Sequence, residues 1–269
     1  MTAARLPDGL ASGERRPLAR LLTAIEAGDP SARELLPELF AAGRGGHVVG
    51  ITGPPGSGKS TLVNALTGEW RRRGRRVGIL AVDPSSPYTG GAIMGDRIRM
   101  MEHAADRDVF MRSMASRGEL GGLAATTWIA AAALDAAGFD PILIETVGAG
   151  QSEVEVARIA ETTVVVEVPE MGDEVQAIKA GLLEIADVIA VNKADRPGAQ
   201  QAARQLRAML STAGGRVTRE PPPILMTTAS TGTAWPSSRM RSTSIGPAHD
   251  PRTRLANGPA ARSSVRWPS

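Results

Sequence analysis

GPPGSGKST, residues 53–61, is the stretch of sequence that decides the fold of this 269-residue chain. It matches the phosphate-binding loop G-x-x-x-x-G-K-[S/T] at every fixed position. Residues 47–52 before it are typical of a short buried strand, and residues 62–66 after it open a helix. The alternative is a glycine-rich turn that carries a lysine by chance, but the complete pattern between a strand and a helix favours a phosphate-binding loop.

Each residue type in the loop suits the binding of nucleotide phosphates. Glycines let backbone N–H groups turn toward the phosphate oxygens, and the helix N-terminus behind them adds a favourable dipole. Lys59 is expected to reach the β- and γ-phosphates, and the Ser60 hydroxyl is expected to hold Mg²⁺. The residues expected to bind the phosphates are Gly53, Gly56, Ser57, Gly58, Lys59, Ser60 and Thr61.

Short apolar runs alternate with helical patterns after the loop. The predicted strands cover residues 77–82, 109–111, 141–144, 163–166, 188–191 and 224–226, and the predicted helices include residues 123–134 and 200–210. This alternation predicts an α/β fold, a P-loop domain over residues 46–232 whose mainly parallel sheet has helices on both faces. Ligands of such sheets bind at the carboxyl ends of the strands, where Asp83, Glu145 and Asn192 lie.

Residues 1–45 are predicted to form a helical extension ahead of this domain. The first 14 residues are expected to be frayed. Apolar residues then recur at helical spacing at positions 18, 21, 22 and 25, and Gly28-Asp29-Pro30 ends that helix. Residues 31–34, SARE, match the capping box of a second helix, which Pro37 is expected to kink or shorten. We expect this helical hairpin to contribute packing and no chemistry.

The composition excludes several kinds of site and location. The chain has no cysteine, which excludes disulfides, thiolate metal sites and a thiol nucleophile. No apolar run approaches the ~20 residues of a membrane-spanning helix, and the N-terminus lacks the apolar core of a signal peptide. The histidines at positions 47, 103 and 248 show no metal-ligand spacing and are interpreted as structural. We therefore expect a cytoplasmic protein without a membrane partner.

The net charge offers no argument for a nucleic-acid partner. Residues 233–269 hold six arginines against one aspartate, which gives this segment a net charge of +5. The whole chain carries +3, so residues 1–232 carry −2. One basic run remains, RRRGRR at residues 71–76, where a predicted helix meets the next strand. Complementation of the helix dipole and solvation explain this run better than a binding patch does.

The sequence Asn192-Lys193-Ala194-Asp195 follows directly after a predicted strand. Its aspartate can accept both the N1–H and the exocyclic N2–H₂ of guanine, while the lysine stem lies along the base. Adenine offers no such pair of donors, so a carboxylate in this place discriminates against it. N-K-x-D alone is a weak match, but near the end of a P-loop domain it indicates a guanine site. Thr228 and Ala229, after the last predicted strand, are expected to supply a backbone N–H for the guanine O6.

Two further segments place acidic residues beside the predicted phosphates. Glu145, in E-T-V-G at the end of its strand, suits contact with Mg²⁺, and the N–H of Gly148 suits a γ-phosphate oxygen. Asp83 and Asp96 border a glycine-rich loop whose carboxylates are placed to approach the metal and whose glycines permit movement on hydrolysis. Taken alone, these two aspartates are more often a turn residue and a helix cap.

Together these residues resemble the MeaB/ArgK family, the G-protein chaperones of the cobalamin enzyme methylmalonyl-CoA mutase. The resemblance runs from about residue 45 to residue 232, and the preceding hairpin fits too. The matching stretches are GPPGSGKST, VDPSSPYTGGAIMGDRIRM, SRGELGGL, ETVGAGQSE, EVPEMGDEVQAIKAGLLEIAD and NKAD. Their order and length make the resemblance specific, because the phosphate loop and N-K-x-D alone would indicate only a GTPase.

The resemblance implies Mg²⁺-dependent GTP hydrolysis coupled to the delivery and protection of adenosylcobalamin on the mutase. It assigns Lys59 and Ser60 to phosphate and metal, Asp83, Asp96 and Glu145 to the acidic metal environment, and Asn192 and Asp195 to guanine. The glutamate before T-V-G is a family feature. Residues 172–179 resemble a third switch loop, through which the family communicates with its partner.

Two other functions stay open at this point. An older family label, amino-acid-transport ATPase or kinase, implies an adenine nucleotide, and Asp195 argues against that base. The third hypothesis is a regulatory module that binds GTP and barely turns it over. The sequence offers no obvious arginine finger and no glutamine directly after Gly148, so slow intrinsic hydrolysis is expected under all three.

Beyond Gly232 the chain departs from the family, which continues into helices that form its dimer. Residues 233–269 are rich in Ser, Arg, Pro and Gly without hydrophobic periodicity, so we expect a disordered tail. A frameshift near residue 233 is our preferred explanation, and a natural disordered tail is the alternative. The codons ACC GGC CTG GCC GAG CTC encode a family-like TGLAEL, and after the loss of one C they encode TAWPSS, the sequence of residues 233–238.

A tail that replaces the dimer helices predicts a monomeric or aggregation-prone chain, because the apolar faces that those helices cover would lack partners. Protease should remove residues 233–269 quickly, while GTP binding persists, since every predicted nucleotide motif ends by residue 232. Coupling to the mutase should be impaired, because a dimeric clamp would lose one arm. Gel filtration with light scattering checks the oligomeric state, and a stable, protease-resistant dimer would contradict the prediction.

Overall fold

The structure is a computed structural model, and it describes residues 5–83, 103, 105–115, 122–146, 151–169, 182–213 and 221–231. Within these ranges no helix has both the length and the apolar character that a membrane crossing requires. The predicted tail at residues 233–269 lies outside them, so its disorder stays a prediction.

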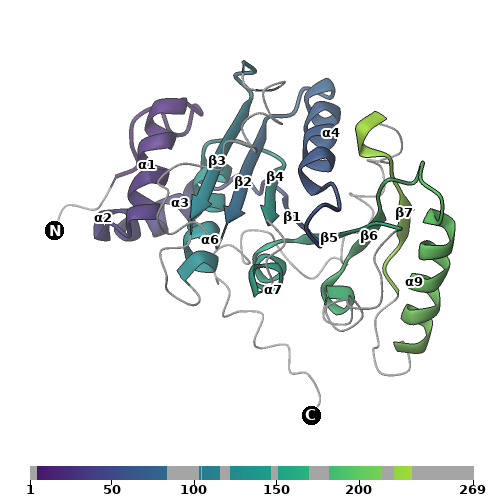
Figure 1. Ribbon diagram of the computed structural model, residues 1–269. Coiled ribbons are helices and arrows are strands. Elements are labelled where there is room, and N and C mark those ends of the chain that lie inside the picture. The colour runs from purple at the N-terminus through teal and green to yellow at the C-terminus, as the bar shows by residue number, and fades with distance from the viewer. Residues whose placement is uncertain are drawn as a thin grey trace, which may run out of the picture.

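A seven-stranded sheet runs through the described part of the chain (Figure 1). Its strands are β1 (Val48–Thr52), β2 (Val77–Asp83), β3 (Val109–Ala115), β4 (Ile142–Thr146), β5 (Thr162–Glu167), β6 (Val188–Val191) and β7 (Ile224–Met226). They lie in the order β3-β2-β4-β1-β5-β6-β7, and every neighbouring pair is parallel. The predicted parallel sheet is therefore confirmed, with β3 longer than its sequence pattern indicated.

The register of the central strands places their carboxyl ends at one edge of the sheet. Ile51 of β1 lies level with Glu145 of β4 and with Val164 of β5. Val164 in turn pairs with Val188 at the start of β6. Residues that directly follow these strands consequently meet at one place, although they are far apart in the sequence.

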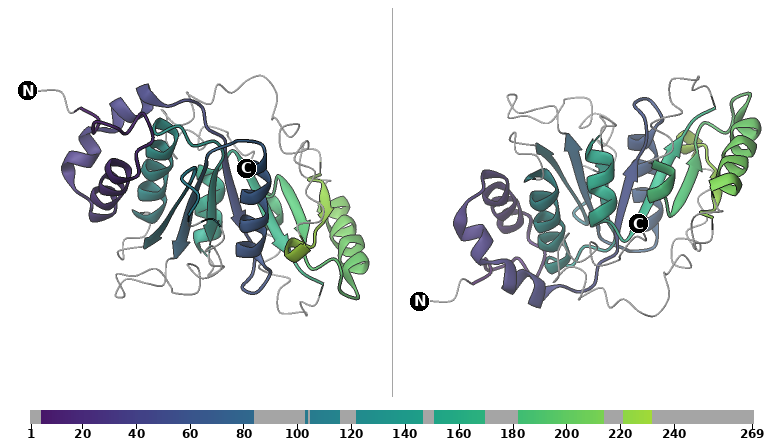
Figure 2. Two further views of the ribbon diagram at one scale, coloured as in Figure 1. Left: turned by 90° about the horizontal axis from the view of Figure 1, so that it is seen from above. Right: turned by 90° about the horizontal axis from the view of Figure 1, so that it is seen from below.

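Alternate residues of each strand face opposite sides of the sheet, and different helices cover the two sides. Helix α4 (Lys59–Arg72) shares an apolar cluster with Val49 and Ile51 of β1. The opposite side carries the helices α6 (Gly122–Ala136) and α7 (Gln151–Ile159), as Figure 2 shows. Helix α9 (Ala199–Ala213) packs against β6 and β7 at the far end of the sheet.

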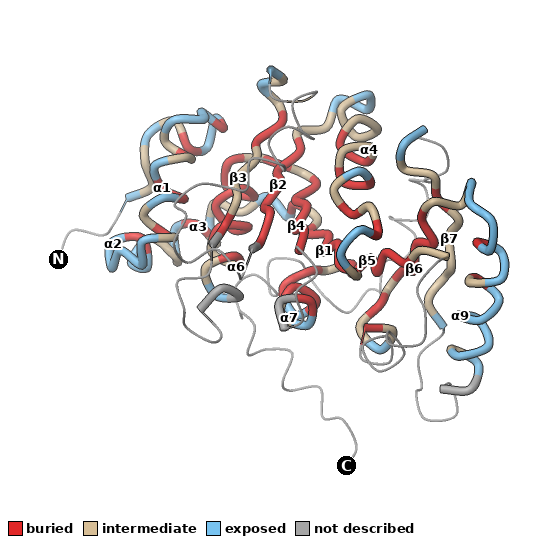
Figure 3. Tube along the Cα trace, viewed as in Figure 1, coloured by how far each residue is buried: buried red, intermediate tan, exposed pale blue. Residues whose placement is uncertain are grey.

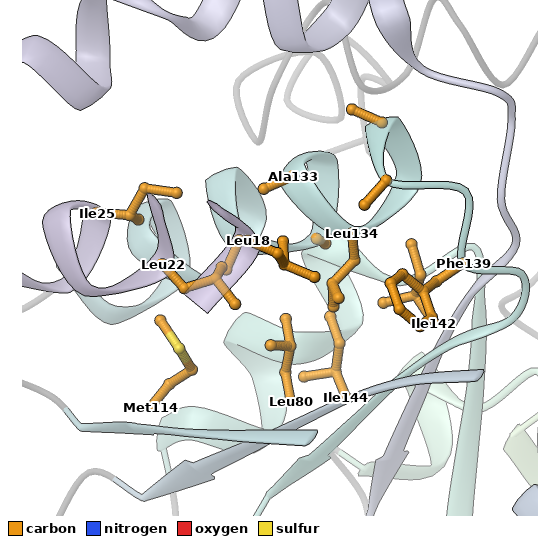
Figure 4. Close-up of a cluster of buried hydrophobic side chains, with 14 of the residues drawn as sticks. Leu18, Leu22, Ile25, Leu80, Met114, Ala133, Leu134, Phe139, Ile142 and Ile144 are labelled. Atoms are coloured by element: carbon orange, nitrogen blue, oxygen red, sulfur yellow. The ribbon is translucent and has the colours of Figure 1, made fainter. Parts of the chain in front are cut away.

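The N-terminal helix α1 (Arg15–Ala27) is part of the main core (Figure 4). Leu18 and Leu22 of this helix lie in one cluster with Leu134 of α6 and Met114 of β3, and all four are at most 1% exposed. Burial of each such side chain contributes about 1.5–3 kcal/mol to stability. Figure 3 shows the same distribution, with buried residues concentrated in the strands and on the inner faces of these helices.

Residues 5–14 are folded, so the prediction of a frayed N-terminus is wrong for them. Leu10 is fully buried, and its N–H donates to the Pro7 carbonyl at 3.1 Å. The Arg76 guanidinium reaches the Gly13 carbonyl at 3.2 Å. Leu10 is a single apolar residue, so the sequence shows no periodicity there. Its burial stabilises the segment because distant residues form the core that surrounds it.

The second predicted helix consists of two short ones, α2 (Pro30–Glu34) and α3 (Leu36–Ala42). Asp29 caps α2, because its carboxylate accepts hydrogen bonds from the N–H and the hydroxyl of Ser31 at 2.9 and 2.8 Å. The predicted capping box on Ser31 is therefore wrong, and Pro30, whose fixed φ suits the first helical position, explains the earlier start. Pro37 lies at the start of α3, and its missing N–H agrees with the predicted interruption.

Arginines of the basic run at residues 71–76, where α4 ends, make contacts within the chain. Arg71 forms ion pairs with Asp106 at 2.7 Å and with Asp108 at 2.9 Å. The Arg76 guanidinium carbon lies 4.4 Å from the centre of the Phe139 ring, a cation–π distance. These contacts add to the predicted dipole and solvation effects.

Asp135 fixes the segment that joins the extension to β1. This aspartate lies on α6, is 1% exposed, and accepts hydrogen bonds from the N–H groups of Arg44, Gly45 and Gly46 at 3.1, 3.3 and 2.7 Å. Burial raises the pKa of Asp135, and the three backbone donors oppose that shift. The segment leads directly into β1 and hence into the phosphate loop.

Asp135→Asn should lower the free energy of unfolding by about 2 kcal/mol, because an amide NH₂ cannot accept and leaves buried N–H groups without a partner. Urea denaturation measures the change. Asp8→Asn is the matched control, since the Asp8 side chain is 95% exposed, and it should shift the value by less than about 0.5 kcal/mol. An unchanged unfolding free energy for Asp135→Asn would show that the three bonds do not hold this joint.

Candidate nucleotide site

The loop between β1 and α4 requires glycine at three positions. Gly53, Gly56 and Gly58 have φ angles of 136°, 75° and 91°, which side chains disfavour. A Cβ on Gly53 would lie 2.2 Å from the Val166 carbonyl oxygen of β5, and a Cβ on Gly58 would lie 2.4 Å from the amide nitrogen of Asn192. The loop thus lies tight against β5 and against the segment after β6. It ends in the N-terminus of the 14-residue helix α4, whose dipole favours phosphate.

Lys59 is buried at the first position of α4, with 5% of its surface exposed. Its ammonium donates hydrogen bonds to the carbonyls of Gly53 and Pro54 at 2.8 and 3.0 Å. Burial lowers the pKa of Lys59, while the charges of Glu145 and Glu153 oppose the shift. The carbonyls of the loop itself therefore hold the Lys59 ammonium in place.

Ser60 and Glu145 meet although they are 85 positions apart, because β4 lies beside β1. The Ser60 hydroxyl donates to Glu145 Oε1 at 2.5 Å, and Glu145 is 8% exposed. Hydroxyl and carboxylate oxygens suit Mg²⁺, which usually takes one or two protein ligands together with substrate phosphates. Among the residues that the structure describes, no group of three or more His, Asp or Glu side chains could hold a metal on its own. The pair therefore fits a cation that the protein shares with a nucleotide.

Asn192 joins the phosphate loop to the segments expected to read the base. Its Nδ2 donates to the Ser57 carbonyl at 2.9 Å. Its Oδ1 accepts from the Ala229 N–H at 3.1 Å and from the Thr227 hydroxyl at 3.3 Å. The side chain is 2% exposed, so both ends of the amide are used within the chain. Asn192 positions the other groups, and the N–H of Ala229 that was expected to approach guanine is engaged with it.

Lys193 and Asp195 lie at the open side of the same segment. Lys193 has a φ of 56°, and its Nζ donates to the Gly56 carbonyl at 2.8 Å. The N–H of Ala194 donates to the Thr227 carbonyl at 3.0 Å, which holds this turn beside Thr228. Asp195 is exposed, so its carboxylate is free to meet a base that enters from solvent.

A family model, "Methylmalonyl Co-A mutase-associated GTPase MeaB", matches residues 18–237. The chain belongs to this family. The matched residues include the phosphate loop, Glu145 and the Asn192–Asp195 segment.

Two relatives of this chain and one solved structure extend this result. A protein of Pyrococcus horikoshii is 53% identical over 194 residues, which are 72% of this chain and 61% of that protein. A "Probable GTPase" of Mycobacterium tuberculosis is 44% identical over 236 residues, 84% of this chain and 70% of that one. The crystal structure of an LAO/AO transport system kinase superposes with a TM-score of 0.66 at 26% identity, covering 94% of this chain and 76% of the other. The chain thus spans about three fifths of the length of its Pyrococcus relative.

Several predicted residues of the nucleotide site lie outside the described part of the chain. Asp96, Gly148 and the predicted switch at residues 172–179 are not described, and neither is the side chain of Asp83, although its backbone ends β2. Their assignments to metal, γ-phosphate and partner communication therefore stay predictions.

Glu153 is a buried acid of the site that the motifs did not indicate. It is 4% exposed and lies in the first turn of α7. Helical spacing places it on the same face as the buried Val156 and Ala160, and this periodicity was the available signal. Motif comparison missed it, because the match ends in Q-S-E without assigning the glutamate a role.

Asp195→Asn should shift base preference from GTP toward xanthosine triphosphate. The amide can donate to the O2 of xanthine, but it cannot accept both guanine donors. Competition binding with the two triphosphates measures the change, and Asp8→Asn serves again as an exposed control. Unchanged GTP affinity would remove Asp195 as the base reader.

Proposed function

We propose that this chain is a Mg²⁺-dependent GTPase that assists adenosylcobalamin loading and protection of a mutase of the methylmalonyl-CoA type. The observation that carries the nucleotide part is the double engagement of Asn192, with Ser57 at 2.9 Å and with Ala229 at 3.1 Å. It unites a phosphate cradle and a base-reading segment in one site, as the binding of a whole nucleoside triphosphate requires.

Phosphate binding would use groups that are already in place. Lys59 would move part of its hydrogen bonding from the loop carbonyls to the β- and γ-phosphates, and the N-terminus of α4 would add its dipole. Ser60 and Glu145 would hold Mg²⁺, which supplies neutralisation of the charge that develops between the β- and γ-phosphates. The chain's own residues hold these groups in position, and such positioning accounts for most of the catalysis in this reaction class.

Intrinsic turnover should be slow. Ala149 follows Gly148, where many GTPases have a water-orienting glutamine, and no obvious arginine finger is present in the sequence. Asp83 and Asp96 are proposed to complete the metal environment. A slow hydrolase of this kind is suited to timing, because its bound state lasts until a partner accelerates hydrolysis or exchange.

The base distinguishes this proposal from an ATPase or a kinase, the second class suggested by the transport label. Asp195 is exposed beside Lys193, whose stem lies over the phosphate loop and whose Nζ binds Gly56. A carboxylate in this position pairs with guanine and leaves adenine without a matching donor pair. Guanine is therefore the proposed base.

The mutase partner is proposed on the family's description, which names the methylmalonyl-CoA enzyme. Residues 172–179 are the proposed segment of communication with that partner, and a homodimer of the family type is proposed to be lost or weakened here. Adenosylcobalamin would be the cargo of the complex and not a resident cofactor of this chain.

Isothermal titration in Mg²⁺ should show binding of GDP and of a non-hydrolysable GTP analogue, and ATP should not compete.

Lys59→Ala should lose roughly 2–4 kcal/mol of transition-state stabilisation in GTP hydrolysis, the scale of one preorganised charge-stabilising donor. Arg72→Ala, an exposed change at the other end of α4, should hydrolyse GTP at the unaltered rate. Equal binding of ATP would favour the ATPase reading, and normal hydrolysis by Lys59→Ala would place the phosphate cradle elsewhere. Pull-down with a mutase then tests the partner.

A further inference from the structure

Glu153 lies at the edge of the sheet where the phosphate loop begins, and the proposed nucleotide site gives it no role. Four residues separate the end of β4 from the start of α7. Helix α7 then runs back along β1, whose Gly50 would bring a Cβ to 2.7 Å from Val156. The first turn of α7 therefore lies at the carboxyl ends of β1 and β4, where the phosphate loop begins. Glu153 belongs to that turn and is 4% exposed.

Glu153 lies one turn before Val156 on the face of α7 that packs against Gly50 of β1, so it lies toward Gly53, whose carbonyl accepts from the Lys59 ammonium at 2.8 Å. Burial raises the pKa of Glu153 and the charge of Lys59 opposes the rise, while Glu153 in turn opposes the fall in the pKa of Lys59. Neither a hydrogen bond nor an ion pair of Glu153 is found within the described ranges. Glu145, the other acid near Lys59, is engaged with the Ser60 hydroxyl at 2.5 Å.

A structural role at the helix end explains this residue incompletely. An acid in the first turn of a helix complements its dipole, and exposed acids do this at little cost. A buried carboxylate is costly unless it is paired. The burial of Glu153 beside the one buried lysine of the site therefore indicates that it serves that lysine.

We propose that Glu153 is a positioning residue of the nucleotide cycle: its carboxylate is the counter-ion of Lys59 when the terminal phosphates are absent, and it competes with them when a nucleotide binds. The inference rests on the phosphate site proposed above. It makes α7 an electrostatic sensor of the phosphate site, since α7 is the helix that follows the β4 loop.

The direction of the expected change in nucleotide affinity follows from the charges of the groups involved. Nucleotide phosphates and the Glu153 carboxylate are both anions, and both are attracted to the same ammonium. Removal of the carboxylate charge should therefore tighten nucleotide binding, whereas a merely structural role predicts weaker binding from a damaged site. At the effective dielectric of partly buried pairs, one such charge changes affinity by about tenfold.

The experiment compares Glu153→Gln with the unaltered chain by isothermal titration with GDP, with a non-hydrolysable GTP analogue and with GMP. GDP and the analogue should bind about tenfold more tightly to the variant. GMP lacks the phosphates that Lys59 binds, so its affinity should change by no more than about twofold. Glu153→Met, a second neutral side chain of similar length, should show the same gain, and this variant decides the question if Glu153→Gln does not fold.

Two variants complete the design. Glu153→Asp keeps the charge and should keep the affinity of the unaltered chain. Glu155→Gln removes an acid from the same helix that is not buried, and it should leave all three affinities unchanged. Unchanged or weaker GDP binding by the neutral Glu153 variants would overturn the inference. Absence of GDP binding in the unaltered chain would instead contradict the proposed nucleotide site.

Discussion

The hydrogen bond from the Asn192 amide to the Ser57 carbonyl, 2.9 Å long and buried, is the interaction on which the candidate site depends. The same side chain accepts the N–H of Ala229 at 3.1 Å, so one amide joins segments that follow β1, β6 and β7. A buried amide that lost one of these partners would have no water to replace it, and this cost keeps the three segments together. The parallel register of the sheet brings them close, and Asn192 then fixes their distance.

Around this joint the protein concentrates charge that a nucleotide can balance. Lys59 is 5% exposed and is surrounded by the loop carbonyls, Glu145 and Glu153. Electrostatic interactions are stronger in such an environment than in water, so small changes of charge have large effects on what binds. Hydrolysis of GTP would change the charge at this position, and under the proposed role of Glu153 the first turn of α7 would sense that change.

The N-terminal extension stabilises the elements that carry the candidate site. Leu10, Leu18 and Leu22 are buried in one cluster with α6, and Asp135 of α6 holds the segment that enters β1. The extension is therefore part of the folded core and sets the position of the strand that carries the phosphate loop. Its predicted role in packing agrees with this arrangement, although its first residues are better ordered than their composition indicated.

The sequence by itself determined the parallel α/β fold, and it predicted the phosphate loop and the base-reading segment, because each depends on local patterns of a few residues. It did not indicate the burial of Leu10, the cap at Asp29, the linking role of Asn192 or the position of Glu153. Each of these depends on which distant groups lie nearby, and burial changes the free energy of the same side chain by several kcal/mol. Only the tertiary structure decided these four features, because the sequence does not show whether a carboxylate lies near a buried ammonium or in water.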